Sequence, residues 1–433
     1  MFVSDSLTVN KDGHLAIASA DVVSLAKKYG TPLYIMDEDK IRRTCCEYME
    51  ALSSCYGDRF SVHYASKAFC AKYMYKIIDQ EKLGADVVSG GELYTAISAG
   101  FPADRISFHG NNKTASEIEY ALSCGISEFV VDNREELFLL NDIANKKGVK
   151  ANISFRIKPG IDAHTHDFVK TGQIDSKFGV ALENGEALEI IKLALGLNNV
   201  KVKGIHCHIG SQIFDSEPFA SAAEVMVGLI KKVRDELNYE LEELNLGGGF
   251  GIRYTERDDP KTIFDTVNNF TNVLKKECKK HNLNLPFLII EPGRSIVAEA
   301  GITVYTVGSV KTIKDVRTYV SVDGGMTDNP RYALYGSEYT MLLPEKPDAE
   351  KDTLVTVAGR NCESGDLLGE NISLPSVKAG DLLCVLSTGA YNYSMASNYN
   401  RVPHPAVIMV SEGKDKLIVR RESYEDLVSN DLI

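Results

Sequence analysis

Residues 60–66 read FSVHYAS, and seven similar runs follow along the chain. Each run is short and rich in β-branched or aromatic residues, and a longer stretch of helical periodicity separates it from the next. The seven are ADVVS (85–89), RISFHG (105–110), EFVVD (128–132), NISFRI (152–157), KGIHCHI (203–209), EELNLGG (242–248) and FLIIEPG (287–293). Strands that alternate with helices predict a parallel sheet, and eight is the number that closes a (β/α)8 barrel.

The stretches between these runs carry helix signals. TASEIEYALSCG (114–125) begins at Thr and NREELFLLNDIANKKG (133–148) at Asn, both common N-caps, and both end at Gly. An open, doubly wound sheet shows the same alternation and stays as the alternative. The stretch 158–185 contains a long loop before its helix, and loops of this length are often functional. A lid over an active site is one such role.

After about residue 300 the pattern changes to β-rich runs without long helices, such as ITVYTVGSVKTI, TLVTVAG and AVIMVSEG. These runs predict an antiparallel β-sandwich or β-barrel domain. The first residues are also strand-like (LTVN, HLAIAS, TPLYIMD), and they precede the barrel. We therefore expect an α/β plus all-β protein, with a (β/α)8 barrel at 38–300 and a discontinuous β domain built from 1–37 and 301–433.

Composition excludes several classes of protein. A chain of 433 residues exceeds the usual single-domain size, and 25% charged residues is ordinary for a soluble protein. A net charge of −12 argues against nucleic acid or an anionic membrane as the main partner. No stretch approaches 18 apolar residues and the first residues lack a basic segment, so we expect a cytoplasmic protein. Nine cysteines without CxxC pairs predict neither a disulfide framework nor a structural zinc site.

Unusual residues follow four of the predicted strands. In a (β/α)8 barrel the active site lies at the C-terminal ends of the strands, so these residues are expected to converge on one rim. They are Lys67 after the first strand, His208 and Ser211 after the sixth, Gly247, Gly248 and Gly249 after the seventh, and Glu291, Pro292, Gly293 and Arg294 after the eighth.

Each of these residues could have either a role in chemistry or an ordinary structural role. A glycine run lets backbone N–H groups approach a phosphate, to which Ser211 could add a hydroxyl, but it also serves a tight turn that needs positive φ. Lys67 is either a surface charge or a desolvated amine suited to a Schiff base. A buried Glu291 needs a cationic partner, which a protonated pyridine nitrogen or a neighbouring arginine would supply.

His206 and His208 form a His-x-His pair at a strand end, and some barrel metallohydrolases begin a metal site in this way. Such a site would need further ligands, for which His109 and Asp132 are available. It would leave the glycine run, Lys67 and EPGR unexplained, so no metal is predicted. His164 and His166 lie in the long loop and are expected to be solvated.

Six motifs in this order carry a family resemblance: YASKA (64–68), HCHIGSQ (206–212), GGGFG (247–251), EPGR (291–294), CESGD (362–366) and GAYNYSMASNYN (389–400). Together they resemble the fold-type III, alanine-racemase-like pyridoxal-phosphate decarboxylases, and within them the diaminopimelate decarboxylases. The resemblance spans about residues 30–405. It implies pyridoxal 5′-phosphate as the cofactor and a homodimer whose active sites lie at the subunit interface.

The resemblance also implies roles for the cofactor-binding residues. Lys67 would hold the cofactor covalently, His208 would stack on its ring, and Glu291 would pair with the pyridinium nitrogen. The remaining contacts, chiefly to the phosphate, are expected from Ser211, Gly247, Gly248, Gly249, Pro292, Gly293, Arg294 and Tyr391.

The implied reaction is decarboxylation of meso-2,6-diaminopimelate to L-lysine and CO2, the last step of lysine biosynthesis. Arg294, Arg331 and Tyr335, with Tyr391, would bind the distal carboxylate of the substrate, and Glu363 would bind its distal ammonium. Cys362 would protonate Cα, and it would come from the partner subunit.

Three alternatives stay open at this point. The first is a sibling decarboxylase acting on ornithine, lysine, arginine or carboxynorspermidine, none of which needs an arginine clamp for a distal carboxylate. The second is a racemase, which would need a tyrosine where CESGD places Cys362. The third is a pyridoxal-phosphate carrier protein, a class that resembles the barrel alone.

Overall fold

A computed structural model describes residues 2–161 and 176–433 of the chain. The chain divides into two compact units. The barrel unit comprises Thr44–Gly251 and Pro260–Gly293, and the sheet unit comprises Met1–Arg43, Ile252–Asp259 and Arg294–Ile433. Half of the predicted 158–185 loop, residues 162–175 with His164 and His166, lies outside the described residues.

Eight parallel strands close on themselves in the described part of the barrel unit. Their order is β5 (Phe60–Ala65), β6 (Gly84–Val87), β7 (Ile106–Phe108), β8 (Glu128–Val131), β9 (Ala151–Lys158), β11 (Val200–Cys207), β12 (Glu243–Asn245) and β13 (Phe287–Ile290). Strand β13 pairs with β5, and β8 pairs with β9, so the sheet has no break. The predicted (β/α)8 barrel is confirmed, and the open-sheet alternative is wrong. A short strand, β10 (Val180–Ala181), adds to β9.

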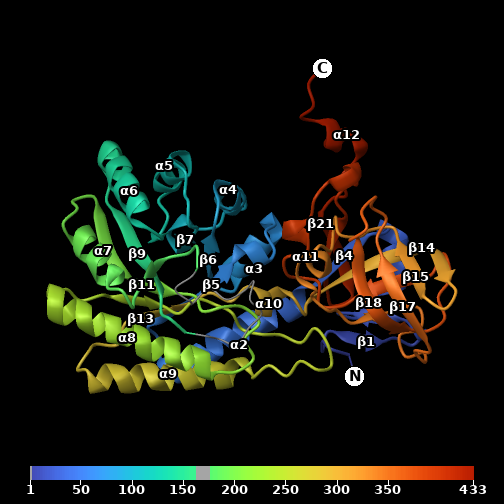
Figure 1. The fold of residues 1–433 in the computed structure, drawn as a ribbon, viewed down its shortest axis with the longest axis horizontal. Coiled ribbons are helices and arrows are strands. Elements are labelled where there is room, and N and C mark those ends of the chain that lie inside the picture. Colours follow the sequence, from blue (N-terminus) through green and yellow to red (C-terminus); the bar gives the residue numbers. More distant parts are fainter. Residues whose placement is uncertain (1, 162–175) are drawn as a thin grey trace. The chain divides into compact units, whose positions relative to one another are not determined.

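Helices follow the barrel strands, and Figure 1 shows α4 to α7 succeeding one another along the outside of the strands. They are α3 (Lys72–Gln80), α4 (Gly90–Ser98), α5 (Ala115–Cys124), α6 (Arg134–Lys147), α7 (Glu186–Leu195), α8 (Glu217–Leu237) and α9 (Ile263–Lys280), with α2 (Glu38–Tyr56) before β5. Thr114 forms a capping box with Glu117, and Asn133 caps α6. Gly125 and Gly148 end these two helices with left-handed backbone, as predicted.

The main sheet of the sheet unit has the order β18-β17-β15-β14-β4-β20-β21, and β19 joins β14 to β16. The strands are β4 (Leu33–Asp37), β14 (Gly301–Ile313), β15 (Arg317–Val322), β16 (Met341–Leu342), β17 (Thr353–Ala358), β18 (Leu367–Leu374), β19 (Leu382–Val385), β20 (Ala406–Ser411) and β21 (Lys414–Val419). Most pairings are antiparallel, as expected, but β15–β17 and β4–β20 are parallel. These pairs are far apart in sequence, so no hairpin sets their direction.

Both chain ends contribute to the core of the sheet unit. A small sheet of β1 (Leu7–Val9), β2 (Leu15–Ile17) and β3 (Ala20–Asp21) precedes α1 (Val22–Tyr29). Leu15 and Leu33 pack with Val304 and Ile408 in one hydrophobic cluster. The short helices are α10 (Arg294–Val297), α11 (Arg331–Tyr335), α12 (Tyr424–Val428) and the 3-10 turns η1 (Ser66–Ala68), η2 (Ala103–Arg105), η4 (Tyr393–Met395) and η5 (Tyr399–Arg401). Among the described residues, no helix has the length and apolar character needed to span a bilayer.

Candidate active site

A cavity of about 180 Å³ lies at the carboxyl ends of the barrel strands. It brings four predicted residues together: Lys67, His208, Gly248 and Glu291. Its other lining residues were not predicted as part of a cofactor site and are Asp86, Val88, His109, Gly110, Arg156, Phe178 and His206. The cavity therefore has an amine, carboxylates and imidazoles within one small volume.

Lys67 lies in the η1 turn directly after β5. The turn is held against the end of β13, because Ala65 N donates to Pro292 O at 3.1 Å. A Cβ on Gly293 would lie 2.7 Å from the Cβ of Ala65, so only glycine allows this close approach. Lys67 itself is exposed, which agrees with the surface-charge alternative and not with a desolvated amine.

Glu291 is a buried carboxylate of the cavity, and the residue is 6% exposed. Its Oε1 accepts hydrogen bonds from His109 Nε2 and Asn245 Nδ2, both at 2.7 Å, and its Oε2 accepts from His206 Nε2 at 3.1 Å. The sequence offered an arginine as its partner within the protein; the described partners are two histidines and an amide. A carboxylate can accept about four hydrogen bonds, so Glu291 has capacity for one further donor.

The charges at Glu291 follow from these contacts. Burial by itself raises the pKa of Glu291, but His109 and His206 hold that pKa well below its ordinary value. Burial lowers the pKa of His206 to about 4. Near neutral pH the cavity therefore presents an ionised carboxylate that accepts a hydrogen bond from the neutral His206 ring.

His208 lies beside the glycine loop, and its Nδ1 accepts a hydrogen bond from Gly248 N at 3.3 Å. Burial, together with the nearby charges of Lys67 and Arg156, holds the pKa of His208 well below its ordinary value. The ring is therefore neutral with its proton on Nε2. An uncharged imidazole that lines the cavity is suited to stacking on a flat aromatic ligand.

The glycine loop makes a tight turn that needs positive φ, and this conformation is compatible with phosphate binding by its backbone N–H groups. Gly247 has φ 68° and Gly249 has φ 110°, so both need a left-handed conformation. The loop lies beside the one that contains Ser211, because Ile213 N donates to Gly249 O at 2.9 Å. The two segments expected to bind phosphate are therefore neighbours in the barrel unit.

Asn245 was missed from the sequence. It ends β12, is 2% exposed, and joins two predicted parts of the site. Its Nδ2 donates to Glu291 Oε1, and its Oδ1 accepts from Gly247 N at 2.8 Å. The available signal was an amide between two leucines in a buried parallel strand, where a polar side chain must find partners.

The residues that could hold a metal ion in the structure differ from those considered in the sequence, which were His206 and His208 with His109 and Asp132. His109, His206 and Glu291 have ligand atoms within 4.8 Å of one another. His208 and Asp132 are not part of this group, so the His-x-His motif does not act as a pair. All three members are already joined by hydrogen bonds through Glu291.

Asp86 also carries a polar atom toward the cavity. Its Oδ1 is buried and has no hydrogen-bond partner among the described residues. Burial and the charge of Glu291 raise the pKa of Asp86 to about 6, although His109 and Lys67 oppose the rise. A buried oxygen of this kind is a position at which a ligand donor would be accommodated.

A second group of predicted residues lies within the sheet unit. Arg294 and Arg331 are each 7% exposed, and both donate to the hydroxyl of Tyr254, at 2.5 and 3.1 Å. Arg331 also donates to Tyr339 at 3.1 Å. The Tyr391 ring lies 4.7 Å from the Arg294 guanidinium and 5.4 Å from that of Arg331.

This arginine–tyrosine cluster (Arg294, Arg331, Tyr254, Tyr335, Tyr339 and Tyr391) is strongly cationic. Arg331 lies 5.9 Å from the Tyr335 ring. Burial raises the pKa of Tyr254, but Arg294 and Arg331 outweigh it and bring that pKa below its ordinary value. Two buried guanidinium groups that share one hydroxyl make a site suited to a carboxylate or a phosphate. Tyr254 and Tyr339 were missed from the sequence.

The CESGD motif forms part of a loop that Asp366 closes. The Asp366 carboxylate accepts hydrogen bonds from Met326 N at 2.6 Å and from Asn361 N at 2.7 Å. Cys362 and Glu363 are exposed on this loop. The backbone N–H of Cys362 donates to Asn400 Oδ1 at 2.7 Å.

Comparisons with known proteins extend over the whole chain. The family model described as "Pyridoxal-dependent decarboxylase, pyridoxal binding domain" matches residues 38–298. The diaminopimelate decarboxylase of Bacillus methanolicus is 49% identical over 422 residues, with 98% of each chain covered. That of Bacillus subtilis is 48% identical over 432 residues, which cover 100% of this chain and 98% of the relative.

A solved structure agrees with these relatives. The diaminopimelate decarboxylase from M. jannaschii, in complex with L-lysine, has a TM-score of 0.93 at 37% identity, and the match covers 100% of this chain and 99% of that one. The family, the relatives and the fold point the same way as the cavity residues. The chain belongs to the diaminopimelate decarboxylase family of pyridoxal-dependent decarboxylases.

Proposed function

We propose that the protein decarboxylates meso-2,6-diaminopimelate to L-lysine and CO2, the last step of lysine biosynthesis, with pyridoxal 5′-phosphate as its cofactor. The observation that carries this proposal is the pair of buried arginines in the sheet unit. Both Arg294 and Arg331 donate to Tyr254 and are 7% exposed. Such a pair suits the distal carboxylate of meso-diaminopimelate, which ornithine and lysine lack.

The barrel cavity fits the cofactor. When bound, pyridoxal phosphate supplies an electron sink for the electron pair released as CO2 leaves. Lys67 offers the amine that holds it, and Glu291 offers an ionised oxygen with capacity for the protonated ring nitrogen. His208 lines the same cavity, and its neutral imidazole would stack on the ring. Ser211, Gly247, Gly248, Gly249 and the segment Pro292, Gly293 and Arg294, with Tyr391, would hold the phosphate.

The substrate is held by charge at its distal end. Arg294, Arg331 and Tyr335 bind the distal carboxylate, with Tyr391 alongside, and Glu363 binds the distal ammonium. Cys362 delivers a proton from its thiol to Cα after CO2 has left, which yields the amine. Exposure of Cys362 on its loop supports delivery to a partner subunit, so we infer a homodimer with shared active sites. We place the enzyme in the cytoplasm.

We also propose a domain assignment. Residues 38–300 form the cofactor-binding barrel domain, and 1–37 with 301–433 form the β domain. Support comes from the two compact units. The compact units differ from the proposed bounds in three segments, because residues 38–43, Ile252–Asp259 and residues 294–300 belong to the sheet unit. The second of these segments brings Tyr254 to the arginines.

A substrate panel tests the proposed specificity. The wild-type enzyme is expected to release CO2 from meso-diaminopimelate with a kcat/KM far above that for ornithine, lysine or arginine. Arg331→Gln should lower kcat/KM for meso-diaminopimelate by about 100-fold, because loss of a buried charged donor costs roughly 2–5 kcal/mol. The matched control is Arg257→Gln, an exposed arginine of the same unit that pairs with Glu338. Preference for a substrate without a distal carboxylate would overturn the proposal.

Asn245→Ala is expected to weaken cofactor binding by about 10- to 100-fold, because a buried hydrogen bond left unmade costs about 1–3 kcal/mol. The substitution removes one donor from Glu291 and leaves Gly247 N without its acceptor. Absorbance titration of the cofactor-free protein measures the dissociation constant. Asn272→Ala, at an exposed amide on α9, should bind the cofactor like the wild type. Equal affinity of the Asn245 variant would show that Glu291 needs no positioning by this amide.

A further inference from the structure

Residues 398–402, here the 398–402 turn, hold the backbone of Cys362. Asn400 Oδ1 accepts a hydrogen bond from Cys362 N at 2.7 Å, and the Tyr399 hydroxyl donates to Cys362 O at 3.5 Å. Both polar groups of the Cys362 backbone therefore contact the same turn. The direction in which its thiol points depends on the geometry of that turn.

The turn adopts an unfavourable backbone conformation. Asn400 has φ 52° and Arg401 has φ 57°, so two successive residues other than glycine are left-handed. Asparagine tolerates this region because of its short polar side chain, but arginine rarely adopts it. Such a conformation persists where surrounding contacts hold it. The 398–402 turn therefore needs support from outside itself.

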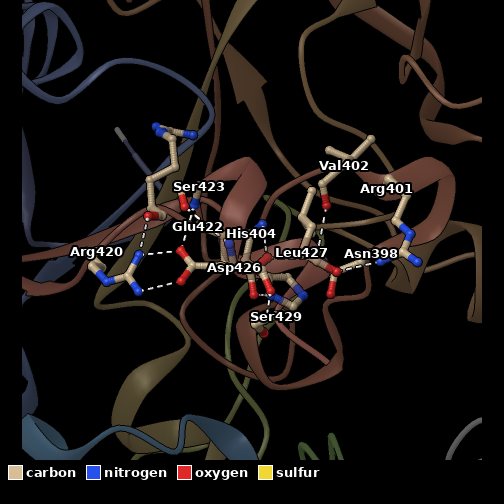
Figure 2. Close-up of polar contacts among 11 residues, drawn as sticks. Asn398, Arg401, Val402, His404, Arg420, Glu422, Ser423, Asp426, Leu427 and Ser429 are labelled. Carbon is tan, nitrogen blue, oxygen red and sulfur yellow. Dashed lines mark hydrogen bonds and ion pairs between the residues drawn. The ribbon is translucent and has the colours of Figure 1, made fainter. Parts of the chain in front are cut away.

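The C-terminal segment 420–431 supplies contacts at both ends of the turn (Figure 2). The Arg401 guanidinium donates to Leu427 O at 2.5 Å and to Asp431 Oδ2 at 2.9 Å. Asn398 Nδ2 donates to Glu422 Oε2 at 2.7 Å. The turn is thus tied to the segment through one side chain on each side of Asn400.

Contacts within the C-terminal segment give it a defined shape. Ser423 and Asp426 form a capping box at the start of α12 (Figure 2). Arg420 Nη2 donates to Asp426 Oδ1 at 2.7 Å and does not contact the 398–402 turn in any described hydrogen bond. These contacts are exposed, and exposed ion pairs add little to global stability. We therefore expect the segment to affect the position of the 398–402 turn more than the free energy of unfolding of the protein.

We propose that the C-terminal segment 420–431 is a brace that positions Cys362 for proton delivery, and that Arg401 is the positioning residue that links the brace to the 398–402 turn. The inference rests on the proposed role of Cys362. If it holds, protonation at Cα depends on the segment 420–431, which lies more than fifty residues from Cys362 in the sequence.

Arg401→Ala in the full-length, cofactor-loaded enzyme tests the brace. Hydrogen exchange resolved at the Cys362 amide should become about tenfold faster, because local opening releases the Asn400 acceptor. The kcat for meso-diaminopimelate should fall about tenfold with KM little changed, since a small misplacement of a reacting group slows the chemical step. Tyr424→Ala, which removes a side chain of the same segment that is 77% exposed, is the matched control, and it should leave the exchange rate and kcat at wild-type values.

Two further variants separate the possible failures. Cys362→Ala tests the proposed function: wild-type kcat in that variant would remove the role of Cys362 itself. If Cys362→Ala is slow but Arg401→Ala exchanges and turns over like the wild type, the brace is wrong and the proposed function stands. Asp431→Ala removes one partner of Arg401 and leaves the turn residues intact. It should show smaller changes in the same direction, even if Arg401→Ala fails to fold.

Discussion

Lys67→Ala is expected to abolish turnover and to remove the visible-edge absorbance of a lysine-bound pyridoxal group. The amine at this position is the group that would bind the cofactor carbonyl, and alanine has no substitute for it. The fold should be unaffected, because Lys67 is exposed while Ala65, Ser66 and Ala68 supply the packing of the turn. Absorbance and CO2 release measure the two effects.

Lys72→Ala provides the control for this prediction. Lys72 is an exposed lysine five residues further on, at the start of α3. Its variant should keep both the absorbance and the turnover of the wild type. Persistence of the absorbance band in Lys67→Ala would mean that another lysine holds the cofactor. The proposal that the cofactor is bound through Lys67 in the barrel cavity would then be wrong.

Cys362→Ala is expected to lower kcat by about 100- to 1,000-fold, within the range that a general acid contributes. Cofactor absorbance should persist, because the loop that contains Cys362 has its own closure through Asp366. Cys46→Ala, at another exposed cysteine, should turn over normally. Near-normal steady-state turnover of the Cys362 variant would refute its role as the proton donor.

Mixing the two inactive variants tests whether sites are shared between subunits. In a hybrid dimer of Lys67→Ala and Cys362→Ala chains, one of two sites would contain both wild-type residues. Random exchange should then restore about a quarter of wild-type activity, since half of the dimers are hybrids with one intact site each. No recovery after subunit exchange would show that each site is built within one chain.

The barrel was predictable because its signal is local. Each of the eight strands carries its own β-branched or aromatic run, and parallel order follows from the helices between them. The pairings β4–β20 and β15–β17 were not predictable, because direction in a sheet is fixed locally only where a hairpin joins two strands. Strand β10 has two residues, too few for any periodic signal.

Some residues of the candidate site could be predicted from the sequence and others could not, again according to whether their signal is local. Lys67, His208, Gly248 and Glu291 could be grouped because each follows a barrel strand, and strand ends meet at one rim. Asn245 could not, since a single amide within a strand has no motif and its partner Glu291 follows a different strand. The role of His206 was also missed, because its contact with Glu291 joins residues 85 positions apart.

The position of β4 in its sheet has a consequence during synthesis. Strand β4 (Leu33–Asp37) lies between β14 and β20, and β20 begins at Ala406. At 5–20 residues per second, β4 emerges from the ribosome roughly 20 to 70 seconds before β20. The barrel strands are complete by Ile290 and can close during this interval. The nascent chain is therefore expected to carry an unpaired apolar strand until β14 has been made, and that strand stays an unprotected sheet edge until β20 follows.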